Sequence, residues 1–196
     1  MKKVLNFYFD FGSPTAYLAH TQLQRFAETY DLEVVYEPML LGALLKANNN
    51  LPPAAVPAKG RYMLKYDLPR FVKRYQVPFK MNPHFPINTL HLMRGCFAAE
   101  EMGCFKQYVE LMFRAMWVDA LNMGDLEQVE SVMQGAGLDS GTLLALCERE
   151  EIKNKLKSHT NNAIEKGVFG APTFYLGEEM FFGQDRLDFI EAALQD

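Results

Sequence analysis

The stretch VLNFYFDFGSP at residues 4–14 decides the fold of this chain. Its β-branched and aromatic residues at 4–9 predict a short buried strand. Apolar residues then recur at helical spacing over 23–30, which makes Ser13 a candidate N-cap and Pro14 a candidate first helical residue. A helix N-terminus carries free N–H groups and partial positive charge, so this turn is suited to hold an anion such as a thiolate. Ordinary capping by Ser13 is the alternative explanation of the same residues.

The composition limits the class of protein and its partners. The chain has 196 residues, enough for one sizeable domain or one domain with an insertion, and its 49% hydrophobic and 22% charged residues are typical of soluble globular proteins. A net charge of −4 argues against nucleic-acid binding. We expect a cytoplasmic protein without a membrane partner, because the sequence shows neither a secretory signal nor an apolar run of about 18 residues.

The cysteines and histidines form no recognisable catalytic or metal-binding motif. Cys96, Cys104 and Cys147 are an odd number without a C-x-x-C pair, which favours reduced thiols and predicts no metal site. None of the four histidines belongs to a motif that pairs it with Ser13, so no catalytic triad is expected. His84 stands apart from the others, because its proline-rich loop could border a pocket.

The order of the remaining patterns predicts strands at both ends and helices in the middle. A second strand at 33–37 follows the first helix, which implies a parallel pair of strands joined by a right-handed crossover. Near the C-terminus, a turn at 168–172 leads into a hairpin whose second strand covers 180–182, and a final helix runs over 186–194. The helical patterns between these parts lie at 58–77, 88–102, 105–117, 125–134, 143–147 and 148–166.

This order predicts a thioredoxin-like α/β fold with a large all-helical insertion. We expect residues 1–57 and 148–196 to form the thioredoxin-like domain and residues 58–147 to form the inserted helical domain. Residues 47–57 contain three asparagines and three prolines, which predicts a long surface loop that is either functional or a plain connector. Seven of the twenty basic residues lie between 46 and 74, where they could attract a small carboxylate or form only a solvated helix face.

Four motifs in this order resemble a known family. They are DFGSPTAYLA at 10–19, PAKGRYM at 57–63, VFGAPTF at 168–174 and FFGQDRL at 181–187. Together they resemble the 2-hydroxychromene-2-carboxylate isomerases, which are related to kappa-class glutathione transferases and to DsbA oxidoreductases, and the match covers essentially the whole chain. The resemblance implies glutathione as cofactor, a small aromatic carboxylate as substrate, and a homodimer.

The resemblance also implies roles for single residues. Ser13 falls where DsbA-type enzymes carry the first cysteine of C-x-x-C, and a serine there in the isomerases hydrogen-bonds the glutathione sulfur, so Ser13 is the implied catalytic residue. Ala171 precedes the implied cis-proline, Pro172, and would offer its backbone N–H and C=O to the cysteinyl part of glutathione. Gln184 and Asp185 would hold the γ-glutamyl end.

Further residues are implied to surround the glutathione and the substrate. Phe182 stands where many relatives carry tryptophan and would pack alongside the tripeptide. The other residues implied for glutathione are Asn50 and Gly183. The residues implied for the aromatic carboxylate are Lys46, Asn50 and Lys59.

The implied activity is glutathione-dependent isomerisation, in which a thiolate adds reversibly, a ring opens and a bond rotates. A kappa-type glutathione transferase that conjugates electrophiles is one alternative, because it shares the glutathione site. A non-catalytic thioredoxin-fold binding module is another, and it would show no glutathione dependence. A disulfide oxidoreductase is disfavoured, because residues 12–15 contain no cysteine.

Overall fold

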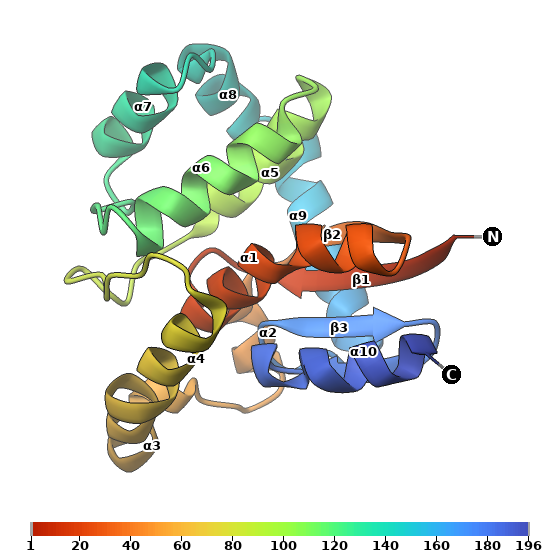
Figure 1. Ribbon diagram of the computed structural model, residues 1–196. Helices are drawn as coiled ribbons and strands as arrows, with labels where there is room; N and C mark the ends of the chain where they lie inside the picture. Colours follow the sequence, from red (N-terminus) through yellow and green to blue (C-terminus); the bar gives the residue numbers. More distant parts are fainter. Residues whose placement is uncertain (1, 196) are drawn as a thin grey trace.

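The computed structural model describes residues 2–195 and contains a four-stranded mixed sheet in the order β2-β1-β3-β4 (Figure 1). The central strand β1 runs parallel to β2 and antiparallel to β3, and β3 forms the predicted antiparallel hairpin with β4. The predicted strand–helix–strand unit is therefore confirmed. The strands are β1 (Lys3–Phe9), β2 (Leu32–Pro38), β3 (Thr173–Leu176) and β4 (Glu179–Phe182).

The helices agree closely with the predicted ones, with small differences at their ends. The predicted helix over 58–77 is interrupted by one π-helical turn, Met63–Asp67, and the last α-helix is preceded by a 3₁₀ turn, Gln184–Arg186. Another 3₁₀ turn, Pro53–Ala55, lies in the predicted surface loop. The α-helices are α1 (Pro14–Thr29), α2 (Leu41–Ala47), α3 (Pro57–Tyr62), α4 (Leu68–Tyr75), α5 (Leu90–Glu101), α6 (Phe105–Trp117), α7 (Leu126–Gly135), α8 (Ser140–Cys147), α9 (Glu150–Glu165) and α10 (Leu187–Gln195).

The sheet is covered on both faces, because side chains that alternate along β1 enter two different clusters. Phe7 and Phe9 belong to the larger cluster, which α1 and α10 join, whereas Tyr8 belongs to a smaller cluster with residues of α2 and α9. Figure 1 shows α9 passing behind the sheet while α1 and α10 lie in front of it. The Phe7 ring stacks on the rings of Phe9 and Phe174, each with a centroid distance of 5.3 Å.

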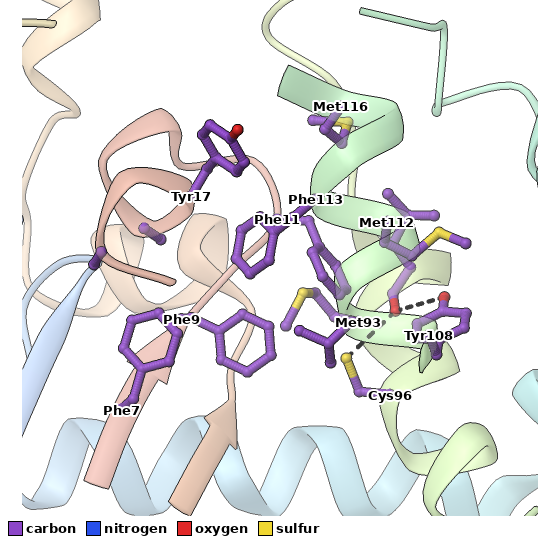
Figure 2. Close-up of a cluster of buried hydrophobic side chains, with 14 of the residues drawn as sticks. Phe7, Phe9, Phe11, Tyr17, Met93, Cys96, Tyr108, Met112, Phe113 and Met116 are labelled. Carbon is purple, nitrogen blue, oxygen red and sulfur yellow. Dashed lines mark hydrogen bonds between the residues drawn. The ribbon is translucent and has the colours of Figure 1, made fainter. Parts of the chain in front are cut away.

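The large cluster continues without a break from the sheet into the inserted helices (Figure 2). Phe11 follows β1 and packs edge-on against Phe113 of α6 at 4.8 Å, and Met93 and Tyr108 extend the cluster into α5 and α6. Helix α9 contacts α5 as well as α2 and β2. The division into residues 1–57 with 148–196 and residues 58–147 stays a prediction, and the packing joins the two parts through one core.

The contact between α5 and α6 predicts a glycine whose replacement is not tolerated. A Cβ at Gly95 would lie 2.0 Å from the hydroxyl oxygen of Tyr108, which is buried and donates to the Leu92 carbonyl at 3.0 Å. We expect Gly95→Ala to lower the free energy of unfolding by about 1–3 kcal/mol, the usual effect of overpacking a core. Urea denaturation monitored by circular dichroism measures this change.

The matched control for that variant is Gly42→Ala in α2, because an added Cβ there meets no atom within 4 Å. Alanine is the better helix former, so this substitution should leave the free energy of unfolding unchanged or raise it by up to about 1 kcal/mol. Equal unfolding free energies for the two variants would contradict the close contact between Gly95 and Tyr108.

Candidate active site at the start of helix α1

Ser13 occupies the predicted position at the beginning of α1. Its Oγ accepts a hydrogen bond from the backbone N–H of Ala16 at 3.1 Å, and Pro14 is the first helical residue, so both predictions for this turn are confirmed. The same Oγ donates to the carbonyl oxygen of Ala171 at 3.0 Å and lies 3.0 Å from Oγ1 of Thr15. Ser13 is buried at 4% exposure. The Ser13 hydroxyl therefore both caps α1 and contacts Ala171, which lies 158 residues further along the chain.

The loop that faces Ser13 contains the implied cis-proline. The bond between Ala171 and Pro172 is cis, as expected. The Ala171 carbonyl oxygen also accepts from Oγ1 of Thr15 at 3.2 Å, and the Pro172 carbonyl accepts from the backbone N–H of Gly183 at 2.9 Å. These bonds hold the loop between the start of α1 and the end of β4.

The carboxylate of Asp10 fixes the turn that carries Ser13. Asp10 is fully buried, and its Oδ1 accepts from the Gly12 N–H at 2.8 Å and from Thr89 Oγ1 at 2.7 Å, while its Oδ2 accepts from the Leu41 N–H at 2.8 Å. Burial raises the pKa of Asp10, and these three hydrogen bonds act in the opposite direction. The turn after β1, the start of α2 and the start of α5 are thereby tied to one side chain.

The segment after β4 brings together the residues implied for the γ-glutamyl end. Gly183 has a φ of +103°, and a Cβ there would lie 2.4 Å from Oδ1 of Asp185, so only glycine suits this position. Asp185 is exposed and pairs with the neighbouring Arg186. Gln184 is buried, and its carbonyl accepts from the hydroxyl of Tyr75 at 2.9 Å. Helix α4 of the insert therefore contacts this segment directly.

Two further predicted residues lie beside the cis-proline loop. The Asn50 amide donates to the carbonyl of Phe169 at 3.3 Å, and its oxygen accepts from the Leu51 N–H, so both ends of this side chain already have partners. The ring of Phe182 lies 4.5 Å from that of Phe169 and covers Gly170, where a Cβ would be 2.6 Å from the Phe182 ring. Phe182 remains 40% exposed and is available to a ligand.

The two lysines implied for the substrate are not brought into this cluster by any described contact. Lys46 is exposed at the end of α2, and its segment is joined to the cis-proline loop through Asn48, whose amide donates to the Val168 carbonyl at 3.3 Å. Lys59 is exposed on α3, and among residues 2–195 no hydrogen bond or ion pair connects it to Ser13. Their implied roles stay predictions.

Thr15 and Asn48 belong to this arrangement although sequence reasoning did not single them out. The hydroxyl of Thr15 contacts both Ser13 and Ala171, and its position two residues after Ser13 was the available signal. Asn48 lies in the asparagine run of the predicted loop, and the sequence alone does not tell which asparagine of that run faces another segment.

In the part of the chain that the structure describes, no hydrogen bond joins a cysteine or histidine side chain to Ser13. The three cysteines are free thiols, and burial raises the pKa of each of them, which keeps them protonated. A groove of about 880 Å³ lies along α1 and α6, with His20 and Glu110 in its wall, and Ser13 is not among its lining residues. His84 is exposed. Within residues 2–195, no helix is long and apolar enough to span a membrane, and no group of three His, Cys, Asp or Glu side chains is placed to hold a metal ion.

The start of α1 therefore presents the Ser13 hydroxyl next to the main-chain carbonyl of Ala171, which comes from another segment. A helix N-terminus and a serine hydroxyl both stabilise negative charge there. The Ala171–Pro172 loop faces them with main-chain groups, and Gly183 and Asp185 lie at its other end. A mixed sheet with these features and a helical segment between β2 and β3 defines a thioredoxin-like protein with an all-helical insertion, as the sequence predicted.

The chain belongs to the family of DSBA-like thioredoxin domains, because the family model matches residues 4–195. It is 31% identical to a 2-hydroxychromene-2-carboxylate isomerase of Pseudomonas sp. (strain C18), over 97% of this chain and 90% of that protein. It is 27% identical to glutathione S-transferase kappa 1 of Rattus norvegicus, over 96% and 89% of the two chains. A solved structure of a 2-hydroxychromene-2-carboxylate isomerase is similar with a TM-score of 0.87 at 30% identity, over 98% of this chain and 94% of that one. The resemblance stated from the four motifs is confirmed.

The Asp10 network predicts that a neutral amide cannot replace the carboxylate. Asn at position 10 has only one acceptor oxygen, so its NH₂ group would face either the Leu41 N–H or the donors on the other side. We expect Asp10→Asn to lower the free energy of unfolding by about 1–3 kcal/mol, because a buried donor is left without a partner. Urea denaturation at neutral pH measures this loss.

Asp125→Asn is the control, because Asp125 is also an aspartate that accepts a backbone N–H, that of Glu127 at 3.0 Å, but at the exposed start of α7. Asparagine is an equally good N-cap there, so the variant should unfold like the unmodified protein. If Asp10→Asn were as stable as this control, the three hydrogen bonds of Asp10 would not hold the turn as described.

Proposed function

We propose that this protein is a glutathione-dependent isomerase of 2-hydroxychromene-2-carboxylate-type aromatic compounds, with Ser13 contacting the glutathione sulfur. One observation carries the proposal: the Ser13 hydroxyl lies at the start of α1, 3.0 Å from the carbonyl before Pro172. This geometry occurs in a chain with about 30% identity to isomerases over nearly its whole length. A peptide thiol is the ligand that matches both the anion-stabilising hydroxyl and the main-chain groups opposite it.

The residues at the site fit the parts of glutathione. A thiolate would lie at the Ser13 hydroxyl, and the backbone N–H and C=O of Ala171 would pair with the cysteinyl unit. Gln184 and Asp185 would hold the γ-glutamyl end, with Gly183 allowing a close approach of the backbone. Phe182 and Asn50 would line the tripeptide from the two sides of the cis-proline loop.

Ser13 and the helix N-terminus together would ionise the bound thiol near neutral pH. A free thiol has a pKa of about 8.5, so only a few per cent is thiolate at pH 7. A helix N-terminus contributes about 0.3–1 kcal/mol to an anion, and one pKa unit corresponds to about 1.4 kcal/mol. The donated Ser13 hydrogen bond would add about 1.5–3 kcal/mol. Together these two contributions would lower the pKa of the glutathione thiol enough for a substantial fraction to be thiolate near pH 7.

When bound, glutathione would supply a thiolate that adds reversibly to the conjugated substrate, so that the ring opens, a bond that was double rotates, and the thiol is regenerated. The chain would supply the positioning. Lys46 or Lys59 would pair with the substrate carboxylate and stabilise negative charge that develops on its oxygen. Ser13 would hold the glutathione sulfur in place while the negative charge on the sulfur decreases on addition to the substrate and returns when the thiolate leaves.

A kappa-type glutathione transferase is the second candidate function. The observation in its favour is the 30% identity to glutathione S-transferase kappa 1 of Caenorhabditis elegans, over 97% of this chain. Both activities would use the same Ser13 site, and they differ in the fate of glutathione. An isomerase regenerates it, whereas a transferase consumes one molecule for each product.

The test is therefore an assay with glutathione far below the substrate concentration. Isomerisation of 2-hydroxychromene-2-carboxylate is followed by absorbance, and free thiol is counted before and after the reaction. Many turnovers without loss of thiol would support the isomerase. Thiol consumption with aromatic electrophiles but no isomerisation would support the transferase, and no binding of millimolar glutathione would exclude both activities and leave a binding module.

Ser13→Ala should raise the pKa of bound glutathione and reduce turnover at pH 7, because it removes the hydroxyl donor. We expect a shift of roughly one unit and a fall in kcat/KM of tenfold or more. The thiolate absorbance of the complex, titrated against pH, measures the shift. Ser13→Ala also removes a helix cap, so Asp125→Ala, which removes the cap of α7, is the matched control and should titrate like the unmodified protein.

Asp185→Asn should mainly weaken glutathione binding, because a carboxylate that would accept from the γ-glutamyl ammonium loses its charge. We expect the dissociation constant to rise by roughly tenfold, the equivalent of one charge-assisted hydrogen bond. Isothermal titration calorimetry measures the constant. Asp188→Asn is the control, since Asp188 pairs with Arg74 one turn further on and should not alter binding. A constant unchanged by Asp185→Asn would place the γ-glutamyl end elsewhere.

A further inference from the structure

We propose that Thr15 is a positioning residue for the glutathione sulfur, and that its hydroxyl frees the Ser13 proton to point at the thiolate. The inference rests on the proposed glutathione site and names a residue that acts through Ser13. It arises from the contacts of three oxygen atoms at the start of α1, those of Ser13, Thr15 and Ala171.

These three oxygens form a closed triangle. Oγ of Ser13 lies 3.0 Å from Oγ1 of Thr15 and 3.0 Å from the Ala171 carbonyl oxygen, and Thr15 Oγ1 lies 3.2 Å from the same carbonyl oxygen. Ser13 also accepts from the Ala16 N–H at 3.1 Å. Each of these distances allows a hydrogen bond, so the number of hydroxyl protons decides which of the hydrogen bonds form at one time.

The triangle contains two hydroxyl protons and one oxygen that can only accept. The carbonyl of Ala171 has no proton to give, and it has two lone pairs. Ser13 has one proton, which it can give to Ala171 or to a sulfur, but not to both. If Ser13 were the only hydroxyl near Ala171, turning its proton toward the sulfur would take a donor away from the carbonyl.

Thr15 can assist the Ser13–sulfur hydrogen bond in either of its two orientations. Its proton can remain on the Ala171 carbonyl when that of Ser13 turns toward the sulfur. Alternatively it can be donated to Ser13 Oγ, and a hydroxyl that accepts a hydrogen bond is a stronger donor. In the first arrangement the Ala171 carbonyl keeps a hydroxyl donor, and in the second the Ser13–sulfur hydrogen bond is strengthened while neither hydroxyl donates to that carbonyl.

Thr15 contributes little to capping α1, so helix capping does not explain the position of its hydroxyl. Ser13 is the residue that caps the helix, and both described hydrogen bonds of the Thr15 hydroxyl lead to site atoms. Valine has the same shape as threonine without the hydroxyl, so it removes the proton and keeps the β-branched packing.

The experiment is a pH titration of the thiolate absorbance, at about 240 nm, of the glutathione complex in Thr15→Val and Thr15→Ser. We expect Thr15→Val to raise the pKa of the bound thiol by roughly half a unit to one unit, and Thr15→Ser to titrate like the unmodified protein. If Thr15→Val does not fold, Thr15→Ala takes its place. Calorimetry under the same conditions measures how much glutathione binds.

Two further measurements make the result specific to the route through Ser13. In a Ser13→Ala background, Thr15→Val should cause no further change in the thiol pKa, because the Ser13 proton that Thr15 would free is already absent. An additional shift in that double variant would show that Thr15 contacts the sulfur directly and would overturn the proposal. An unshifted pKa in Thr15→Val, when Ser13→Ala does shift it, would overturn the proposal while leaving the glutathione site intact.

Failure of the proposed function has a different signature. If the unmodified protein bound no glutathione, or if Ser13→Ala left the thiol pKa unchanged, the site itself would be wrong and the role of Thr15 would be refuted with it. If Thr15→Ser shifted the thiol pKa as much as Thr15→Val does, the effect would come from packing and not from the hydroxyl. That result would also overturn the proposal.

Discussion

The buried carboxylate of Asp10 is the constraint on which the site depends. Burying a carboxylate is unfavourable unless donors surround it, and here the donors come from three separate segments, at Gly12, Leu41 and Thr89. Because the two oxygens of one carboxylate have a fixed separation, these segments cannot move independently. The turn that carries Ser13 is thus held against the start of α2 and the start of α5 before any ligand binds.

The inserted helices hold the same turn from another direction. The indole N–H of Trp117, at the end of α6, donates to the Phe11 carbonyl at 2.8 Å, and Tyr75 of α4 donates to the Gln184 carbonyl. Both bonds connect the insert to backbone on either side of the site. The insert therefore shapes the site through backbone contacts, and its core is continuous with that of the sheet.

The sequence predicted those parts of the fold that depend on local patterns. The strand–helix–strand unit, the Ser13 cap and the β3–β4 hairpin follow from periodicity and turn residues, and all three are present. The contact of Ser13 with Ala171 spans 158 residues, so it could be expected only through the family resemblance. The bond between Asp10 and Thr89 joins the turn after β1 to the insert and depends on where α5 begins in space, which no local pattern encodes.

In the proposed function the reactive atom is the sulfur of the ligand and not the Ser13 oxygen. In residues 2–195, no histidine contacts Ser13: His20 lies between Tyr36 and Glu110, and His159 lies beside Glu37. A serine without a base is a weak nucleophile, but its hydroxyl is a good donor to an anion. Cys96 and Cys147 are buried thiols and Cys104 is half-buried, and burial raises the pKa of all three. In the proposed function the start of α1 therefore stabilises a sulfur that the ligand brings, because residues 12–15 contain no cysteine that could exchange disulfides.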